Sequence, residues 1–138
     1  MNNNKQYLTE YMIKKQNIKY KLYKVEEIKQ SADIKAVQYD KEKVGKTNKI
    51  SDPMEAIDKY LDAERELQEE VKKLSEQTKY INSKIQLLKD NMEKEVLFDF
   101  FVIDLTIDEI AKKLKKKKQF ILKIYESGIQ NLQLWTVF

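Results

Sequence analysis

The chain has 138 residues, of which 36% are charged and 41% are hydrophobic, and its formal net charge is +4. It contains 2 glycines and 1 proline, and so few helix breakers in a chain rich in lysine and glutamate predict an all-α protein. It has no cysteine and no histidine, which excludes disulfides, thiolate zinc sites and a histidine general base. We therefore expect no enzyme activity, no metal and no cofactor.

We expect no export signal at the start of the sequence. The first ten residues, MNNNKQYLTE, lack the apolar run of a signal peptide. Nowhere do apolar residues continue for the roughly 18 positions that a membrane span needs. We predict a cytoplasmic protein with no membrane contact.

Positive charge is concentrated toward the two ends of the chain. Residues 1–51 hold 12 lysines and 6 acidic residues, whereas residues 52–95 hold 8 basic and 12 acidic residues. Residues 96–138 again have an excess of lysine, with 7 lysines and 5 acidic residues. An acidic middle argues against contact with nucleic acid there, so the two ends are the candidates for that role.

Two long helices are predicted in the N-terminal part. Apolar residues at helical spacing indicate a first helix over residues 5–36, and the pattern is lost in residues 37–51, which we predict to be a mobile loop. The second helix is predicted to start at Asp52-Pro53-Met54-Glu55. There Asp52 is the expected N-cap, Pro53 occupies the first helical position and Glu55 completes the cap.

The second helix carries a heptad seam between residues 57 and 92. Nine of eleven positions at alternating spacings of three and four residues are apolar; the eleven are Ile57, Tyr60, Glu64, Leu67, Val71, Leu74, Thr78, Ile81, Ile85, Leu88 and Met92. This spacing predicts a coiled coil, in a helix of about 40 residues. We predict that the seam folds against the first helix as a hairpin and also pairs with a second copy, which makes residues 1–92 a dimerisation region. A monomeric hairpin is the alternative.

Residues 93–138 are predicted to form a small helical domain with its own core. A third helix is expected over residues 93–103, followed by two shorter helices joined by a tight turn in Leu105–Leu132. Thr106 and Glu109 have the spacing of a capping box at the start of the first of these. The predicted core residues are Leu97, Phe101, Ile110, Leu114, Ile121, Ile124 and Leu132.

The two shorter helices are both amphipathic. Ile107, Ile110, Ala111 and Leu114 recur at helical spacing in the first. In the second, Ile121, Ile124, Tyr125, Gly128 and Leu132 cluster on one side of the helix, and Gln119, Lys123, Glu126 and Gln130 fall on the other. A short helix, a basic turn and a second helix make the layout of a helix-turn-helix, which places its second helix in the major groove of DNA.

The lysine run in the turn and the polar side of the second helix are the predicted DNA-binding residues. Lys115, Lys116, Lys117 and Lys118 are expected to contact phosphates and to fix the orientation of the protein. Gln119 and Lys123 are expected to reach base edges, because Gln suits adenine and Lys suits guanine, and Gln130 is a further candidate. Alternatively, the lysine run is simply a solvated turn.

The segment LTIDEIAKKL and the following helix, which ends in GIQNL, resemble region 4 of bacterial sigma factors. The segment EVLFDFFVID is similar to the helix that leads into that motif, and with the long N-terminal helices the chain resembles the ArpU/RinA-like group of phage-encoded regulators. In that pattern a Gly and a small hydroxyl residue usually occupy the turn, where this chain has Lys115 and Lys117. Asp104 stands in place of a Gly, and Gly128 in place of a small Ala.

The resemblance implies a transcriptional regulator of late phage or prophage genes that binds double-stranded DNA and acts through RNA polymerase. Two other functions are compatible with the same layout. One is a small terminase subunit, which combines a helix-turn-helix with a coiled-coil oligomer. The other is a coiled-coil interaction protein whose degenerate helix-turn-helix docks on polymerase or on another regulator instead of on DNA.

Overall fold

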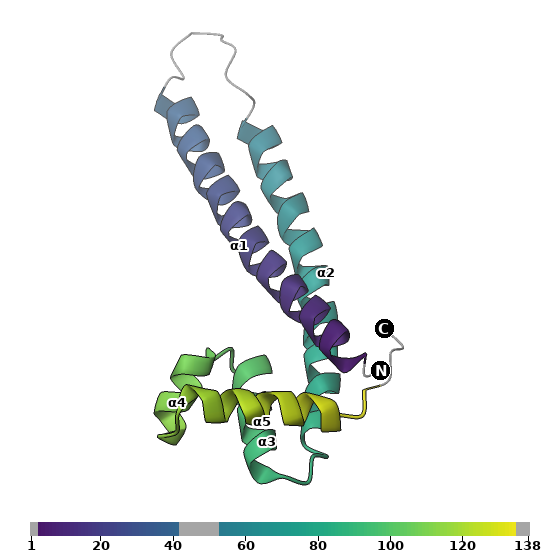
Figure 1. The fold of residues 1–138 in the computed structure, drawn as a ribbon. Coiled ribbons are helices and arrows are strands. Elements are labelled where there is room, and N and C mark those ends of the chain that lie inside the picture. Colours follow the sequence, from purple (N-terminus) through teal and green to yellow (C-terminus); the bar gives the residue numbers. More distant parts are fainter. Residues whose placement is uncertain (1–2, 42–52, 135–138) are drawn as a thin grey trace. The chain divides into compact units, whose positions relative to one another are not determined.

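The computed structural model describes residues 3–41 and 53–134, and side chains within residues 3–31 and 54–134. The described residues form helices joined by short turns, without a strand, which confirms the prediction of an all-α chain. In order along the chain the helices are α1 (Asn4–Lys41), α2 (Pro53–Ile85), α3 (Asn91–Phe101), α4 (Ile107–Leu114) and α5 (Lys118–Asn131) (Figure 1).

The chain divides into two compact units, which we call the core unit and the two-helix unit. The core unit contains residues 1–14 and 74–138, and the two-helix unit contains residues 15–73. The predicted boundary between residues 92 and 93 does not coincide with this division. The reason is that the first residues of α1 and the last residues of α2 pack with α3 and α5.

In the two-helix unit, α1 and α2 lie side by side. Lys21 of α1 forms a salt bridge of 2.6 Å with Glu70 of α2, and Ile18 and Leu67 are buried. Helix α1 continues to Lys41, so the first residues of the predicted loop 37–51 are helical, and residues 42–51 lie outside the described part of the chain. Helix α2 begins at Pro53 as predicted, but the predicted cap at residue 52 also lies outside the described residues.

Helix α2 is shorter than the seam predicted, because it ends at Ile85 instead of continuing to residue 92. A turn follows, in which the backbone N–H of Leu88 donates to the carbonyl of Ile85 at 3.0 Å. Helix α3 then starts at Asn91, two residues earlier than predicted, because the Asp90 side chain caps it by accepting hydrogen bonds from the N–H groups of residues 92 and 93. Leu88 follows the heptad spacing although it lies in the turn after α2, and its side chain is buried.

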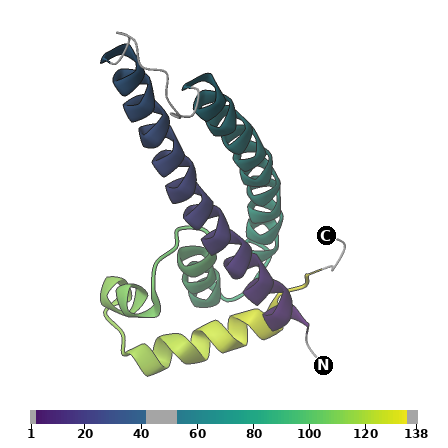
Figure 2. The ribbon, with the colours of Figure 1, turned by 90° about the horizontal axis from the view of Figure 1, so that it is seen from above.

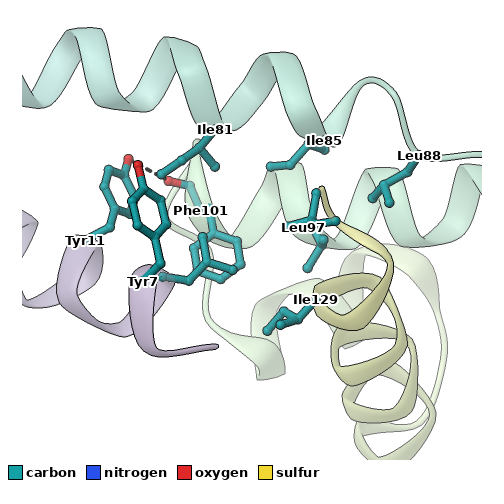
Figure 3. Close-up of a cluster of buried hydrophobic side chains, with 10 residues drawn as sticks. Tyr7, Tyr11, Ile81, Ile85, Leu88, Leu97, Phe101 and Ile129 are labelled. Carbon is teal, nitrogen blue, oxygen red and sulfur yellow. Dashed lines mark hydrogen bonds between the residues drawn. The ribbon is translucent and has the colours of Figure 1, made fainter. Parts of the chain in front are cut away.

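The larger hydrophobic cluster of the core unit draws on four helices. Its buried members are Tyr7, Leu8, Tyr11, Ile81, Ile85, Leu88, Leu97, Phe101, Ile129 and Leu132. Figure 3 shows Tyr7 and Tyr11 projecting from α1 toward Ile81 and Phe101. The Tyr11 hydroxyl lies 2.7 Å from the Thr78 hydroxyl and donates to the Phe101 carbonyl at 3.3 Å, so its polar tip is satisfied inside the cluster.

The smaller cluster joins α3, α4 and α5 through Val96, Ile110, Ala111 and Ile121. The rings of Phe100 and Tyr125 pack edge to face at 5.0 Å beside it. Of the predicted core residues, Leu97, Phe101, Ile110, Ile121 and Leu132 are buried, and Leu114 and Ile124 are half-buried. The smaller cluster lies wholly within residues 93–138, whereas Leu97, Phe101 and Leu132 belong to the larger cluster, which they share with α1 and α2.

The first residues of α1 lie against the C-terminal end of α5 (Figures 1 and 2). The side-chain amide of Asn4 is buried and donates to the carbonyl oxygens of Ile129 and Leu132 at 2.9 and 2.6 Å. The carbonyl groups at the end of a helix lack the regular helical partner, and this amide donates to two carbonyls there; the Ile129 carbonyl also accepts from the Leu132 N–H at 3.4 Å. Residues more than 120 positions apart in sequence thus fix the end of α5.

Helices α3 and α5 approach each other closely at Gly128. A Cβ atom at this position would lie 3.0 Å from Leu97 Cδ1, so the packing leaves no free space for a side chain there. Beside this contact the buried carboxylate of Glu93 accepts a hydrogen bond from the Ser127 hydroxyl at 2.6 Å and from the Asn131 amide at 3.1 Å. Close backbone approach and a satisfied buried carboxylate therefore lock α5 onto α3.

Candidate nucleic-acid interface

Helix α4 begins with the capping box that the sequence predicts. The Thr106 hydroxyl accepts a hydrogen bond from the Glu109 N–H at 3.1 Å, and the Glu109 carboxylate accepts one from the Thr106 N–H at 3.1 Å. On the predicted apolar face, Ile110 and Ala111 are buried, while the two flanking members of that face are half-buried. Local sequence therefore fixes both the start of α4 and the side that it turns inward.

An ion pair between an exposed lysine and a buried carboxylate also attaches α4 to α3. The Lys113 ammonium group donates to both carboxylate oxygens of Asp99, at 3.1 and 2.9 Å, and Asp99 is buried. The hydrogen bond to Asp99 raises the pKa of Lys113 above its usual value. Sequence reasoning missed this pair, because nothing in a lysine close to a run of four other lysines shows that it pairs with a buried carboxylate.

The turn between α4 and α5 contains a residue in the left-handed region. Lys115 has φ 56° and ψ 44°, and the N–H of Lys116 donates to the carbonyl of Ala111 at 3.0 Å to close the end of α4. Asp104 has φ 70°, and these two are the non-glycine residues with positive φ in the described part of the chain. Both stand at positions where the sigma-region-4 pattern has a glycine, which adopts this conformation without steric cost.

All four lysines of the run are exposed around the start of α5. Lys117 is the N-cap residue, and its side chain makes no capping hydrogen bond. The first N–H groups of α5 form the positive end of the helix dipole, and no N-cap side chain accepts hydrogen bonds from them. Lys118 lies 3.4 Å from the Asp108 carboxylate in an exposed ion pair. Four cations beside an uncapped helix N-terminus form a surface that attracts phosphate groups.

The two sides of α5 are those that the sequence predicts. Ile121, Gly128 and Leu132 are buried, and Ile124 and Tyr125 are half-buried. On the opposite side the exposed residues are Gln119, Lys123, Glu126 and Gln130. This side therefore offers amide and ammonium groups that can donate hydrogen bonds to base edges.

Glu126 is the carboxylate on this exposed side, and it faces a cation from another helix. Its carboxylate lies 3.7 Å from the Lys5 ammonium group of α1, and both side chains are largely exposed. The sequence places Glu126, a negative charge, on the same side as Gln119 and Lys123. The structure adds a nearby lysine that is 121 positions away in sequence, which reduces the repulsion of a nearby phosphate.

Sequence reasoning also missed an aromatic side chain on the exposed surface of α5. Phe120, the third residue of the helix, is 45% exposed, and the Lys116 ammonium group lies 5.7 Å from the centre of its ring. The helical pattern contains the signal, because position 120 does not belong to the apolar face that includes Ile121, Ile124 and Tyr125.

The described residues show neither a metal-binding group of side chains nor a membrane-spanning helix. They contain no group of three or more acidic residues that could hold a metal ion. None of the described helices is both long and apolar enough to cross a membrane. No family model, no curated protein and no solved structure matches the chain.

Proposed function

We propose that the protein is a DNA-binding regulator that controls late phage or prophage genes, with α4 and α5 as its helix-turn-helix. The observation that carries this proposal is the exposed lysine run at an uncapped N-terminus of α5, next to a helix side with Gln119 and Lys123. Phosphate contacts supply most of the affinity of such an interface, and base contacts supply its specificity. A cytoplasmic location and the absence of catalysis belong to the same proposal.

Each group of residues has a separate role in this proposal. Lys115, Lys116, Lys117 and Lys118 bind phosphates, and Gln119 and Lys123 reach base edges in the major groove, with Gln130 about two turns after Lys123. The capping box and the pair between Lys113 and Asp99 hold α4 so that α5 can enter the groove.

The backbone supports the resemblance to sigma region 4. Asp104 and Lys115 stand where that pattern has two glycines. If both residues had ordinary helical or extended conformations, the chain would resemble the pattern in sequence but not in backbone conformation. Both instead have positive φ, the conformation for which glycine is selected. The resemblance is the reason for proposing RNA polymerase as a second partner.

Dimerisation through a coiled-coil hairpin is also part of the proposal. In the core unit the seam residues Ile81, Ile85 and Leu88 are already buried within one chain, so they are not free to pair. In the two-helix unit the apolar side chains of Leu61 and Val71 remain exposed. Burial of apolar surface is favourable, so a second copy is proposed to pair through residues 57–73 of the predicted seam region.

Sedimentation at tens of micromolar tests the assembly. A dimer that becomes a monomer when Leu61 and Val71 are changed to Glu supports pairing through the two-helix unit. A monomeric wild type contradicts it. A ring of many copies favours the small terminase function instead.

DNA binding is tested with lysine and glutamine variants of the full chain. Changing Lys116 and Lys118 to Ala should weaken binding to all duplexes about equally and reduce the salt slope by about 0.9 for each lost phosphate contact. Changing Gln119 or Lys123 to Ala should reduce the preference for particular base pairs, at about 1–3 kcal/mol for a good bidentate contact. A matched control is the pair Lys79 and Lys89, also exposed but outside the lysine run and outside residues 57–73, whose change to Ala should leave binding unaltered.

Docking on a protein is the second candidate function, and the carboxylates of the interface favour it. Asp108 is paired with Lys118, and Glu126 lies in the middle of the exposed side of α5, so part of the positive charge is neutralised. If the wild type shows no salt-dependent binding to any duplex at low salt, the DNA-binding proposal fails. Binding to RNA polymerase that requires the α5 surface would then support docking.

A further inference from the structure

Phe120 is an aromatic side chain that the packing of the core unit does not use. It is 45% exposed, and it belongs neither to the buried members of the two hydrophobic clusters nor to the half-buried residues around them. Leaving a large aromatic side chain partly in water forgoes the free energy that its burial would contribute. Its ring is therefore available to a partner outside the core of this unit.

The surroundings of Phe120 place it in the proposed DNA interface. It is the third residue of α5, next to Gln119, and the ammonium group of Lys116 lies 5.7 Å from its ring centre. In a helix-turn-helix the N-terminal residues of the second helix are the ones that contact base edges. The Lys116 ammonium group over the ring would place a phosphate-binding cation close to the base step that Phe120 faces.

An apolar ring at this place has one distinctive target in the major groove. Each base pair presents hydrogen-bonding groups there, but thymine alone among the four bases presents an apolar methyl group, and Phe is among the side chains that contact it. Amide and ammonium groups such as those of Gln119 and Lys123 recognise donors and acceptors, which leaves the methyl group for an apolar neighbour.

We propose that Phe120 is a specificity-determining residue that recognises the 5-methyl group of thymine in the major groove. The ligand class is therefore A·T-containing double-stranded DNA with a thymine at the base step next to the one that Gln119 reads. This inference rests on the proposed function and adds a residue and a base identity to it.

The test compares two duplexes that differ only in the methyl group. One is an alternating adenine–thymine duplex, and the other has the same sequence with every thymine replaced by uracil. The full-length wild type should bind the uracil duplex about fourfold more weakly for each contacted methyl group, from the transfer free energy of one buried methyl-sized group. The Phe120→Ala variant should bind both duplexes equally.

Leu122→Ala is the matched control, because Leu122 is also an apolar, partly exposed residue of α5 and lies two positions away. It should retain the preference of the wild type for thymine. Circular dichroism of each variant verifies that helix content is unchanged, which is expected because the substituted side chains are not in the core.

The outcomes separate this inference from the proposed function. A wild type that binds both duplexes with equal affinity overturns the role of Phe120 and leaves DNA binding intact. The same holds if Phe120→Ala keeps the thymine preference. A wild type that binds neither duplex at low salt overturns DNA binding itself, and the thymine inference with it.

Discussion

The core unit and the two-helix unit share α1 and α2, yet they bury the side chains of these helices to different extents. Along α1, Leu8 and Tyr11 are each 1% exposed in the core unit, whereas Leu22, about three turns after Tyr11 on the same side of the helix, is 51% exposed in the two-helix unit. Of the described apolar side chains in the two-helix unit, Ile18 and Leu67 are buried. The same helical periodicity thus leads to two degrees of burial.

The number of neighbouring helices explains this difference. Two helices side by side can cover one stripe of each other, so apolar residues outside that stripe stay in water. In the core unit α3, α4 and α5 supply further apolar faces, and Leu97, Phe101 and Ile129 complete the cluster around the ends of α1 and α2. The candidate interface lies in the core unit, where packing holds its helices in place.

The largest effect is expected from separating the C-terminal helices from the rest of the core unit. A fragment of residues 93–138 lacks Tyr7, Leu8, Tyr11, Ile81, Ile85 and Leu88, which are six of the ten buried members of the larger cluster. It should therefore show no cooperative thermal transition by circular dichroism. A fragment that melts cooperatively at the temperature of the full chain would instead show that the C-terminal helices fold independently.

A pair of alanine variants compares burial in the two units directly. Ile121 is fully buried in the core unit, and Ile121→Ala should lower the free energy of unfolding by about 2–5 kcal/mol. Leu61 is exposed in the two-helix unit, and Leu61→Ala should change it by roughly 0.5 kcal/mol or less, measured at protein concentrations where the chain is monomeric. Urea unfolding gives both values, and equal costs would contradict the difference in burial.

A glycine substitution should have opposite signs in the two units. Lys115 has positive φ, so Lys115→Gly should stabilise the protein by about 0.5–1 kcal/mol through relief of backbone strain. Lys72 lies inside α2, so Lys72→Gly should destabilise it by about 1 kcal/mol. Each substitution removes one positive charge, so the two variants are matched in charge. A lower free energy of unfolding for Lys115→Gly would show that the backbone at position 115 is not strained.

The smallest effect is expected from alkaline pH. Burial raises the pKa of Tyr125, so the folded protein keeps the phenol proton at a pH where the unfolded chain, with a pKa of about 10, has lost it. Between the pKa of the unfolded state and the higher pKa of the folded state, the unfolded state binds fewer protons than the folded state, so the free energy of unfolding falls as pH rises. The raised pKa of Lys113 acts in the same direction. Its contribution to the free energy of unfolding is present at neutral pH and is lost as the pH rises through the pKa of Lys113 in the folded state.

The change Tyr125→Phe keeps the ring that packs on Phe100 and removes the titrating hydroxyl. The melting temperature of this variant should therefore fall less steeply with pH above about 10 than that of the wild type. An identical slope in both proteins would assign the alkaline loss to other groups.

Local sequence determined the features of this protein that depend on neighbouring residues along the chain. The capping box at Thr106, the inward and outward sides of α5 and the exposed lysine run all follow from side-chain chemistry within a few positions. Such patterns act through backbone hydrogen bonds and helical spacing, which do not require knowledge of the rest of the fold. The pattern of Asp90 and Glu93 also contained the signal for the start of α3, but the continuous heptad spacing masked it.

Tertiary structure alone decided which of the equivalent residues became buried or paired. The heptad pattern treats Ile81 and Val71 alike, but Ile81 is buried because the core unit supplies neighbours for it. Sequence likewise gave no reason to join Asn4 to the end of α5, or Lys113 to Asp99, since these contacts depend on where distant segments meet. A helix specifies its own faces through its spacing, but the partner of each face is set by which apolar surfaces the whole chain can bring together.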